Sequence, residues 1–280
     1  MPSDSYSFIL LSKCEIITSF APYKAHPSHM QQQQASTIEG TQTLSTESLR
    51  LTAFLAPAET IAQQNWWAEL TGAEPESRTS KPGRGESQDT GPCGEGNLVL
   101  SIQPGRVDWL LIPQQENELR FVGRFAETTS TFSELMLKWL ASAPPIIRLG
   151  YGATVHQPAN DRVEAYTLLS KLLPAVQIDT HNSEDILYQI NRPTQSKIVP
   201  GLKINRLGKW TATMFVGVRL DLAKVAFQQY GGPRLFTCRM ELDVNTDGAN
   251  ISPFDHANLT KLLMELRDLT SNLVSNGDRL

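Results

Sequence analysis

The sequence lacks the features that would place it outside an ordinary reducing compartment. Its three cysteines, Cys14, Cys93 and Cys238, are odd in number, far apart and without a C-x-x-C spacing. This argues against a disulfide framework or a zinc site. No apolar run reaches the length of a membrane-spanning helix, and the short apolar stretch Phe8–Ser12 lacks the basic residues that precede the core of a signal peptide. We therefore expect a cytoplasmic protein without a membrane partner.

Strong net charge and the common catalytic signatures are also absent. The net charge is −4, so no bulk attraction to nucleic acid or anionic lipid is expected. There is no G-x-S-x-G, no P-loop, no H-E-x-x-H and no complete G-x-G-x-x-G, and neither His156 nor His256 has a partner at a ligand spacing. These absences favour a non-catalytic protein, and no cofactor is expected.

What is present is a globular chain behind an unusual N-terminus. Residues 1–45 are rich in Pro, Gln, Ser and Thr, a composition typical of a disordered tail. Residues 46–145 and 146–280 form two halves with a similar expected order of elements, β-α-β-β-β-α and β-α-β-β-β-β-α, which we expect to pack as one globular unit. Strands joined by hairpins, with helices segregated between them, predict an α+β fold with largely antiparallel sheets. The similar order is compatible with a duplicated β-α-β-β-β-α unit and equally with coincidence.

Local signals predict the elements of the first half. Residues 49–55 alternate as a strand, and Pro57 opens a helix that continues to Leu70. The Gly-, Pro- and Ser-rich residues 71–96 predict a long surface loop. Pro104 and Gly105 suit the centre of a turn between two strands, and residues 118–125 are expected to add a third. A helix should then begin at the capping pair Thr131 and Glu134.

The second half contains comparable signals. Residues 146–155 predict a strand with Gly150 and Gly152 on its bare face, followed by a helix from Asp161 to Leu173. Residues 202–207 and 211–218 are interpreted as two strands around a tight turn. The last helix is expected to have Ser252 as its N-cap.

A basic stretch is the first candidate site. Between Asp185 and Asp221 there is no acidic residue. The candidate partner-binding residues are Arg192, Lys197, Lys203, Arg206, Lys209 and Trp210. The cations could contact phosphates and Trp210 could stack on a base. The same pattern also fits a solvated sheet face or a protein-binding face, because the C-terminal region is acidic.

Two acidic groups are further candidates. Glu241 and Asp243 fall on one face of a strand with Arg239 and Asn245, so their carboxylates could hold Mg²⁺. An ordinary polar sheet face is the favoured interpretation. The run Asp179–Asp185 looks like a metal or acid–base cluster but is better explained as a turn, where Asp and Asn bond to nearby backbone.

Three short stretches carry a resemblance to a known family. The sequences WLASAPPIIRLGYGATV, ILYQINRP and MELDVNT resemble a sporadically distributed bacterial protein family of unknown function in the layout of residues 49–275. The triplets Ile190–Arg192 and Ile204–Arg206 depart from that family's arrangement, because they do not lie on the strand that directly follows the Trp139 helix. The resemblance implies no activity and no site residues.

Three functional hypotheses follow. The first is a binding module for another macromolecule, most simply a protein partner or a second copy, acting through the face that carries the basic stretch. The second is a metal-dependent enzyme or binding protein that acts on nucleic acid, with Glu241 and Asp243 as ligands. The third is a small-ligand-binding protein with a cavity between its sheet and helices.

Overall fold

The structure is a computed structural model that describes residues 43–56, 65–114, 121–215, 218–221, 226–229 and 235–279. The expected tail, apart from residues 43–45, lies outside these ranges. So do the expected helix start at Pro57 and residues 118–120 of the strand expected over residues 118–125. Residues 121–125 are described and the prediction of a strand there is wrong, since Arg124 forms an isolated bridge with Ser45 and Phe125 begins a helix.

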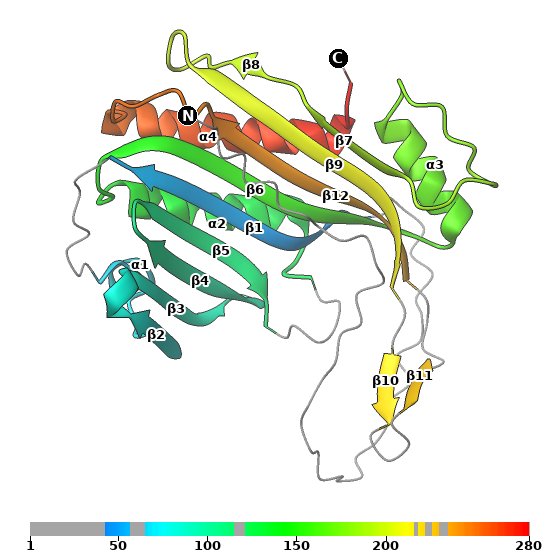
Figure 1. Ribbon diagram of the computed structural model, residues 1–280, viewed down its shortest axis with the longest axis horizontal. Helices are drawn as coiled ribbons and strands as arrows, with labels where there is room; N and C mark the ends of the chain where they lie inside the picture. Colours follow the sequence, from blue (N-terminus) through cyan, green and yellow to red (C-terminus); the bar gives the residue numbers. More distant parts are fainter. Residues whose placement is uncertain are drawn as a thin grey trace.

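One ten-stranded antiparallel sheet forms the centre of the described molecule (Figure 1). Its spatial order is β2-β3-β4-β5-β1-β6-β12-β9-β7, and β8 pairs with β9 beside this path. The strands are β1 (Ser45–Leu55), β2 (Ser77–Lys81), β3 (Glu86–Cys93), β4 (Gly96–Gln103), β5 (Arg106–Pro113), β6 (Ile146–Ala159), β7 (Leu187–Asn191), β8 (Thr194–Gln195), β9 (Lys203–Phe215) and β12 (Leu235–Thr246). A separate ladder joins β10 (Val218–Asp221) to β11 (Ala226–Gln229).

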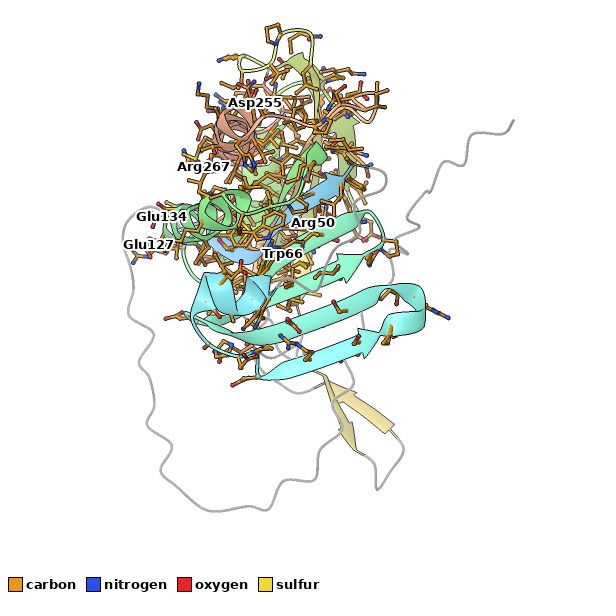
Figure 2. All side chains as sticks on the ribbon, turned by 90° about the vertical axis from the view of Figure 1, so that its left-hand side faces the viewer. Arg50, Trp66, Glu127, Glu134, Asp255 and Arg267 are labelled. Carbon is orange, nitrogen blue, oxygen red and sulfur yellow. The ribbon has the colours of Figure 1, made fainter. Side chains whose placement is uncertain are left out.

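The long helices cover one face of this sheet. They are α2 (Phe125–Leu140), α3 (Arg162–Leu172) and α4 (His256–Asn276), with the short α1 (Trp66–Thr71) and the 3-10 turn η1 (Pro82–Arg84) in the first half. Figure 2 shows α2, marked by Glu127 and Glu134, and α4, marked by Asp255 and Arg267, on the same side of the strands. None of the described helices is long and apolar enough to cross a membrane. The α+β fold with segregated helices is confirmed.

Period-two alternation explains how the sheet is buried on one face. A cross-strand row of Trp109, Leu51, Tyr151 and Val244 runs through β5, β1, β6 and β12, and all four side chains are buried. The residues between them point to the opposite face, which no helix covers in the described part of the chain. We call this opposite side the open face.

The two halves follow the same spatial plan. Their first strands, β1 and β6, lie side by side and antiparallel at the centre of the sheet. Outward from β1 the order is β5, β4, β3, β2, and outward from β6 it is β12, β9, β7. Each half places its last strand beside its first, and each ends in a helix, α2 or α4, which pack against each other. The sheet is therefore arranged symmetrically about the seam between β1 and β6.

Two expected boundaries of the second half are wrong. Residues 203–215 form one continuous strand, β9, because Gly208 does not break it: the ring of Trp210 packs over that glycine. The last helix is capped by Asp255, whose carboxylate accepts the N–H of Asn258 at 2.7 Å, and not by Ser252. The helix expected from Asp161 is confirmed, with Asp161 as its cap.

Two predictions in the first half are also wrong. Residues 77–93 are not a loop but the strands β2 and β3, whose mostly solvated side chains show no apolar alternation. The helix α2 begins at Phe125, six residues before the predicted cap Thr131. The hairpin turn at Pro104 and Gly105 is confirmed, with Gly105 at φ 72°.

Candidate functional site

The predicted basic residues do not share one face. On β9 the side chains of Lys203 and Lys209 lie on the open face, whereas those of Arg206 and Trp210 lie on the helix face, opposite the buried Val244 and Met240. A strand turns alternate side chains to opposite sides, so an odd and an even position cannot act together on one surface. The prediction of a single face that carries all of them is wrong.

Trp210 is the clearest correction. Its side chain is fully buried and its ring centroid lies 6.1 Å from that of Tyr188. The expected role as an exposed stacking platform for a base is therefore wrong. The basic neighbours Lys209 and Arg206 made the position look exposed, but alternation turns this indole into the core.

Arg192 belongs to a structural lock at the C-terminal end of α4, which it forms with Asp278 and Tyr188. Arg192 forms an ion pair with the buried carboxylate of Asp278, which also accepts the Tyr188 hydroxyl at 2.6 Å. The hydrogen bond from Arg192 lowers the pKa of Asp278 more than burial raises it, and the charge of Arg206 lowers it further. Lys197 is exposed on a different segment, where its backbone N–H donates to Glu265 at 2.6 Å.

The open face is instead organised by a belt of ion pairs. Arg50 of β1 reaches across Gly152 of β6 to Asp243 of β12, with a nitrogen–oxygen distance of 3.4 Å. A Cβ on Gly152 would lie 3.4 Å from Nε of Arg50. Because glycine has no side chain, the guanidinium of Arg50 can lie over this residue. The prediction that Gly150 and Gly152 leave a bare face is confirmed, and at Gly152 the approaching group is an arginine side chain from the neighbouring strand.

Glu241 and Asp243 share the open face, as predicted, but both carboxylates already have cationic partners. The carboxylate of Glu241 accepts a hydrogen bond from the ammonium group of Lys209 at 2.9 Å and also forms an ion pair with Arg239. Asp243 forms an ion pair with Arg50. In the described ranges no group of three His, Cys, Asp or Glu side chains is placed to hold a metal ion. A divalent cation at this pair would have to displace arginine or lysine, because each cation already neutralises its carboxylate.

A second cluster on the open face joins three strands through His156. The ring of His156 is fully buried, with Nε2 2.6 Å from Oε2 of Glu47 and Nδ1 2.9 Å from the hydroxyl of Thr237. Arg239 donates to the same Glu47 carboxylate at 3.0 Å. Burial favours the neutral form of Glu47, but the hydrogen bonds from His156 and Arg239 outweigh it and lower its pKa to about 2.

The Thr237–His156–Glu47 chain has the connectivity of a nucleophile, base and acid. A nucleophile must reach a substrate, however, and the Thr237 side chain is fully buried. The rings of Phe121 and Phe215 also flank His156, at 5.3 and 5.6 Å. We assign the cluster a structural role, in which hydrogen bonds between its polar side chains hold β1, β6 and β12 together.

The acidic run Asp179–Asp185 is a turn, as predicted. Oδ1 of Asp179 accepts the backbone N–H groups of His181 and Asn182, both at 3.1 Å. Asp185 has φ 53°, in the left-handed region that suits a turn.

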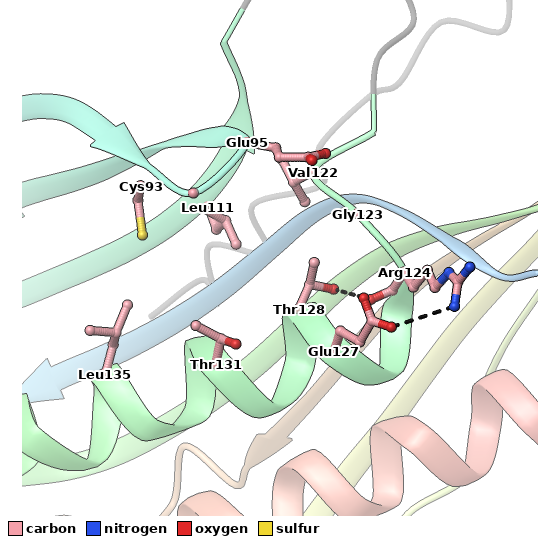
Figure 3. Close-up of a pocket in the computed structure, with 11 residues that line it drawn as sticks. Cys93, Glu95, Leu111, Val122, Gly123, Arg124, Glu127, Thr128, Thr131 and Leu135 are labelled. Atoms are coloured by element: carbon pink, nitrogen blue, oxygen red, sulfur yellow. Dashed lines mark hydrogen bonds and ion pairs between the residues drawn. The ribbon is translucent and has the colours of Figure 1, made fainter.

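A pocket of about 420 Å³ lies between the β3–β4 turn and the first turns of α2 (Figure 3). Leu111, Val122 and Leu135 line it together with Cys93, whose thiol pKa is raised by burial. Its polar groups largely bond within the protein: Arg124 pairs with Glu127 at 3.6 Å, and Thr128 bonds to the Arg124 carbonyl at 2.9 Å. A raised pKa keeps the Cys93 thiol protonated and poorly nucleophilic.

Comparisons with known proteins identify no relative. No family model, no curated protein and no solved structure matches the chain. The resemblance to a sporadically distributed bacterial family stays a prediction.

Proposed function

We propose that the protein is a non-catalytic binding module that takes another protein on its open face. The observation that carries this proposal is the belt of ion pairs on the open face, which no described helix covers. Four cations of this face each form an ion pair with a carboxylate. The pairs are Arg50 with Asp243, Lys203 with Asp247, Lys209 with Glu241, and Arg239 with Glu47. A face with balanced charge suits a polar protein surface, since such a surface can match both signs.

The belt does not favour the nucleic-acid alternative. A phosphate backbone is bound by unpaired cations that release counterions, whereas these cations are already neutralised by carboxylates. Lys203 and Arg206, which would have formed the substrate track, lie on opposite faces of β9. A reducing, cytoplasmic setting belongs to the same proposal and is supported by Cys93 and Cys238, both of which are free.

The test is capture of partners by the tagged full chain at low salt, followed by mass spectrometry and an absorbance ratio for nucleic acid. The decisive variant is Arg50→Glu, which reverses a charge on the open face. Its matched control is Lys138→Glu on α2, an exposed position on the helix side. We expect a stoichiometric protein that is lost with Arg50→Glu, kept with Lys138→Glu, and rebound when both proteins are purified.

Two results would overturn the proposal. One is captured nucleic acid whose binding falls steeply with salt, which would support the alternative. The other is a captured protein that is retained equally by both charge-reversal variants, because its contact would then lie away from the open face.

A further inference from the structure

The two edges of the sheet differ in how they are protected from pairing. An edge strand presents unpaired N–H and C=O groups, and proteins commonly guard it with charged side chains. The β2 edge is guarded in this way: Arg78 pairs with Asp89 at 2.7 Å and Lys81 with Glu86 at 3.3 Å. The β7 edge, Leu187–Asn191, contains no charged residue.

The β7 edge is also apolar where it meets solvent. The exposed large apolar side chains of the described residues are Leu187, Met214 and Ile251. Leu187, on the edge strand itself, is 51% exposed and lies opposite Thr211 on the open face, whereas Met214, three residues further along β9, is 46% exposed on the helix face. An exposed leucine on an uncharged edge strand is typical of an edge that another strand covers.

The backbone direction of β7 can be derived from one hydrogen bond. The N–H of Arg192 donates to the carbonyl of Arg206 on β9 at 3.1 Å. In an antiparallel pair the N–H and C=O groups of successive residues point alternately toward and away from the neighbour. Tyr188 and Ile190 therefore bond toward β9, and the backbone groups of Leu187, Gln189 and Asn191 point outward, where no described strand pairs with them.

This edge is held in place from behind. Tyr188 bonds to Asp278 and its ring lies against Trp210, so the inward side of β7 is fixed to the core. An edge that is already ordered loses little conformational entropy when another strand adds to it.

We propose that the β7 edge pairs with the β7 edge of a second copy of this chain, antiparallel and centred on Gln189. Self-pairing about this residue places Leu187 opposite Asn191 of the partner subunit. The same register places Ile186 opposite Arg192 of the partner subunit, with the acidic Asp185 next along the chain. The interface is self-complementary, and it extends the two open faces into one surface.

Sedimentation velocity of the full chain from about 1 to 100 µM tests this proposal, since a five-residue edge is expected to give a micromolar dimer. We expect Gln189→Pro, which removes the central outward N–H, and Leu187→Lys, which charges the edge, each to weaken the dimer at least about tenfold. The matched controls Gln189→Ala and Thr79→Lys, the latter on β2, should leave it unchanged.

Hydrogen exchange supplies a second measurement in case Gln189→Pro does not fold. The outward amides of Leu187, Gln189 and Asn191 should become protected as the concentration of the unmodified chain rises. A monomer over the whole range would overturn the proposal, and so would a dimer that survives Leu187→Lys. Arg50→Glu should not change the dimer, so this result is distinguishable from failure of the open face to bind a partner.

Discussion

In the first half of the molecule, indole rings join the helices to the sheet. The ring centroids of Trp66 and Trp139 lie 5.8 Å apart, those of Trp109 and Trp139 lie 6.1 Å apart, and Trp67 stacks on Trp109 at 6.2 Å. In the second half the helix layer is aliphatic, formed by the buried leucines of α4, and a polar lock of Arg192, Asp278 and Tyr188 closes its end. The two halves thus share the same order of strands around the seam but are stabilised by different side chains. The strand order therefore does not depend on whether the core is aromatic or aliphatic.

The largest expected effect tests the aromatic half. Trp109→Ala should lower the free energy of unfolding by about 4 kcal/mol, because it empties a fully buried site shared by two other indoles. Urea unfolding followed by circular dichroism measures the loss. The comparison variant is Trp210→Ala, at a fully buried site in the second half. A cost for Trp109→Ala near about 1 kcal/mol would show that the aromatic cluster is not the main support of its half.

The second prediction compares the helix ends of the two halves. Gly277, after α4, has φ 64°, and a Cβ there would overlap the carbonyl of Leu172 on α3. Gly72, after α1, has φ 73° with open space around it. We expect Gly277→Ala to cost about 3 kcal/mol and Gly72→Ala about 1 kcal/mol, both from urea unfolding. Equal costs would mean that the contact between α3 and the end of α4 contributes little.

The third prediction concerns the seam between the halves, which Glu47 crosses. Its pKa is about 2 in the folded protein and 4.5 when unperturbed, so the charged form favours folding. This contribution is complete above pH 4.5 and is lost as the pH falls toward 2. We expect the charged form of Glu47 to contribute about 2 kcal/mol to the free energy of unfolding. This is less than the full pKa shift would give, because the side chain is 29% exposed and solvent screens its charge.

The measurement for Glu47 is urea unfolding as a function of pH. Stability should fall less steeply between about pH 4.5 and 2 in Glu47→Gln than in the unmodified chain. Asp278, whose pKa is also lowered, contributes with the same sign in both proteins and therefore cancels in the comparison. Parallel curves for the two proteins would contradict the assignment.

The smallest effect is expected on the open face of the seam. Gly152→Ala introduces a Cβ at 3.4 Å from Nε of Arg50 and 3.5 Å from the Leu242 carbonyl, which are ordinary contacts. We expect a change within about 0.5 kcal/mol in urea unfolding. If Gly152→Ala lowered the free energy of unfolding as much as Gly277→Ala, the Arg50 side chain would require the absence of a side chain at residue 152.

Alternation in the sequence predicted the strands that have one buried and one solvated face, such as β5, β6 and β12. It could not predict β2 and β3, because most of their side chains are solvated and leave no apolar period. The same-face placement of Glu241 and Asp243 follows from local periodicity. The partners of Glu47 could not be predicted, because His156 is 109 residues away and Arg239 is 192 residues away. Alternation within β9 did contain the signal that separates Lys209 from the buried Trp210.

The lock at the end of α4 has a consequence for synthesis on the ribosome. Asp278, whose backbone N–H donates to Leu172 and whose carboxylate holds Tyr188 and Arg192, is among the last described residues to be translated. The strands of the first half can meet as soon as β6 emerges, because chains fold from the N-terminal side during synthesis. The β7 edge can be fixed only after residue 278 has left the exit tunnel. A nascent chain therefore carries a loose β7 edge until Asp278 can reach Tyr188 and Arg192.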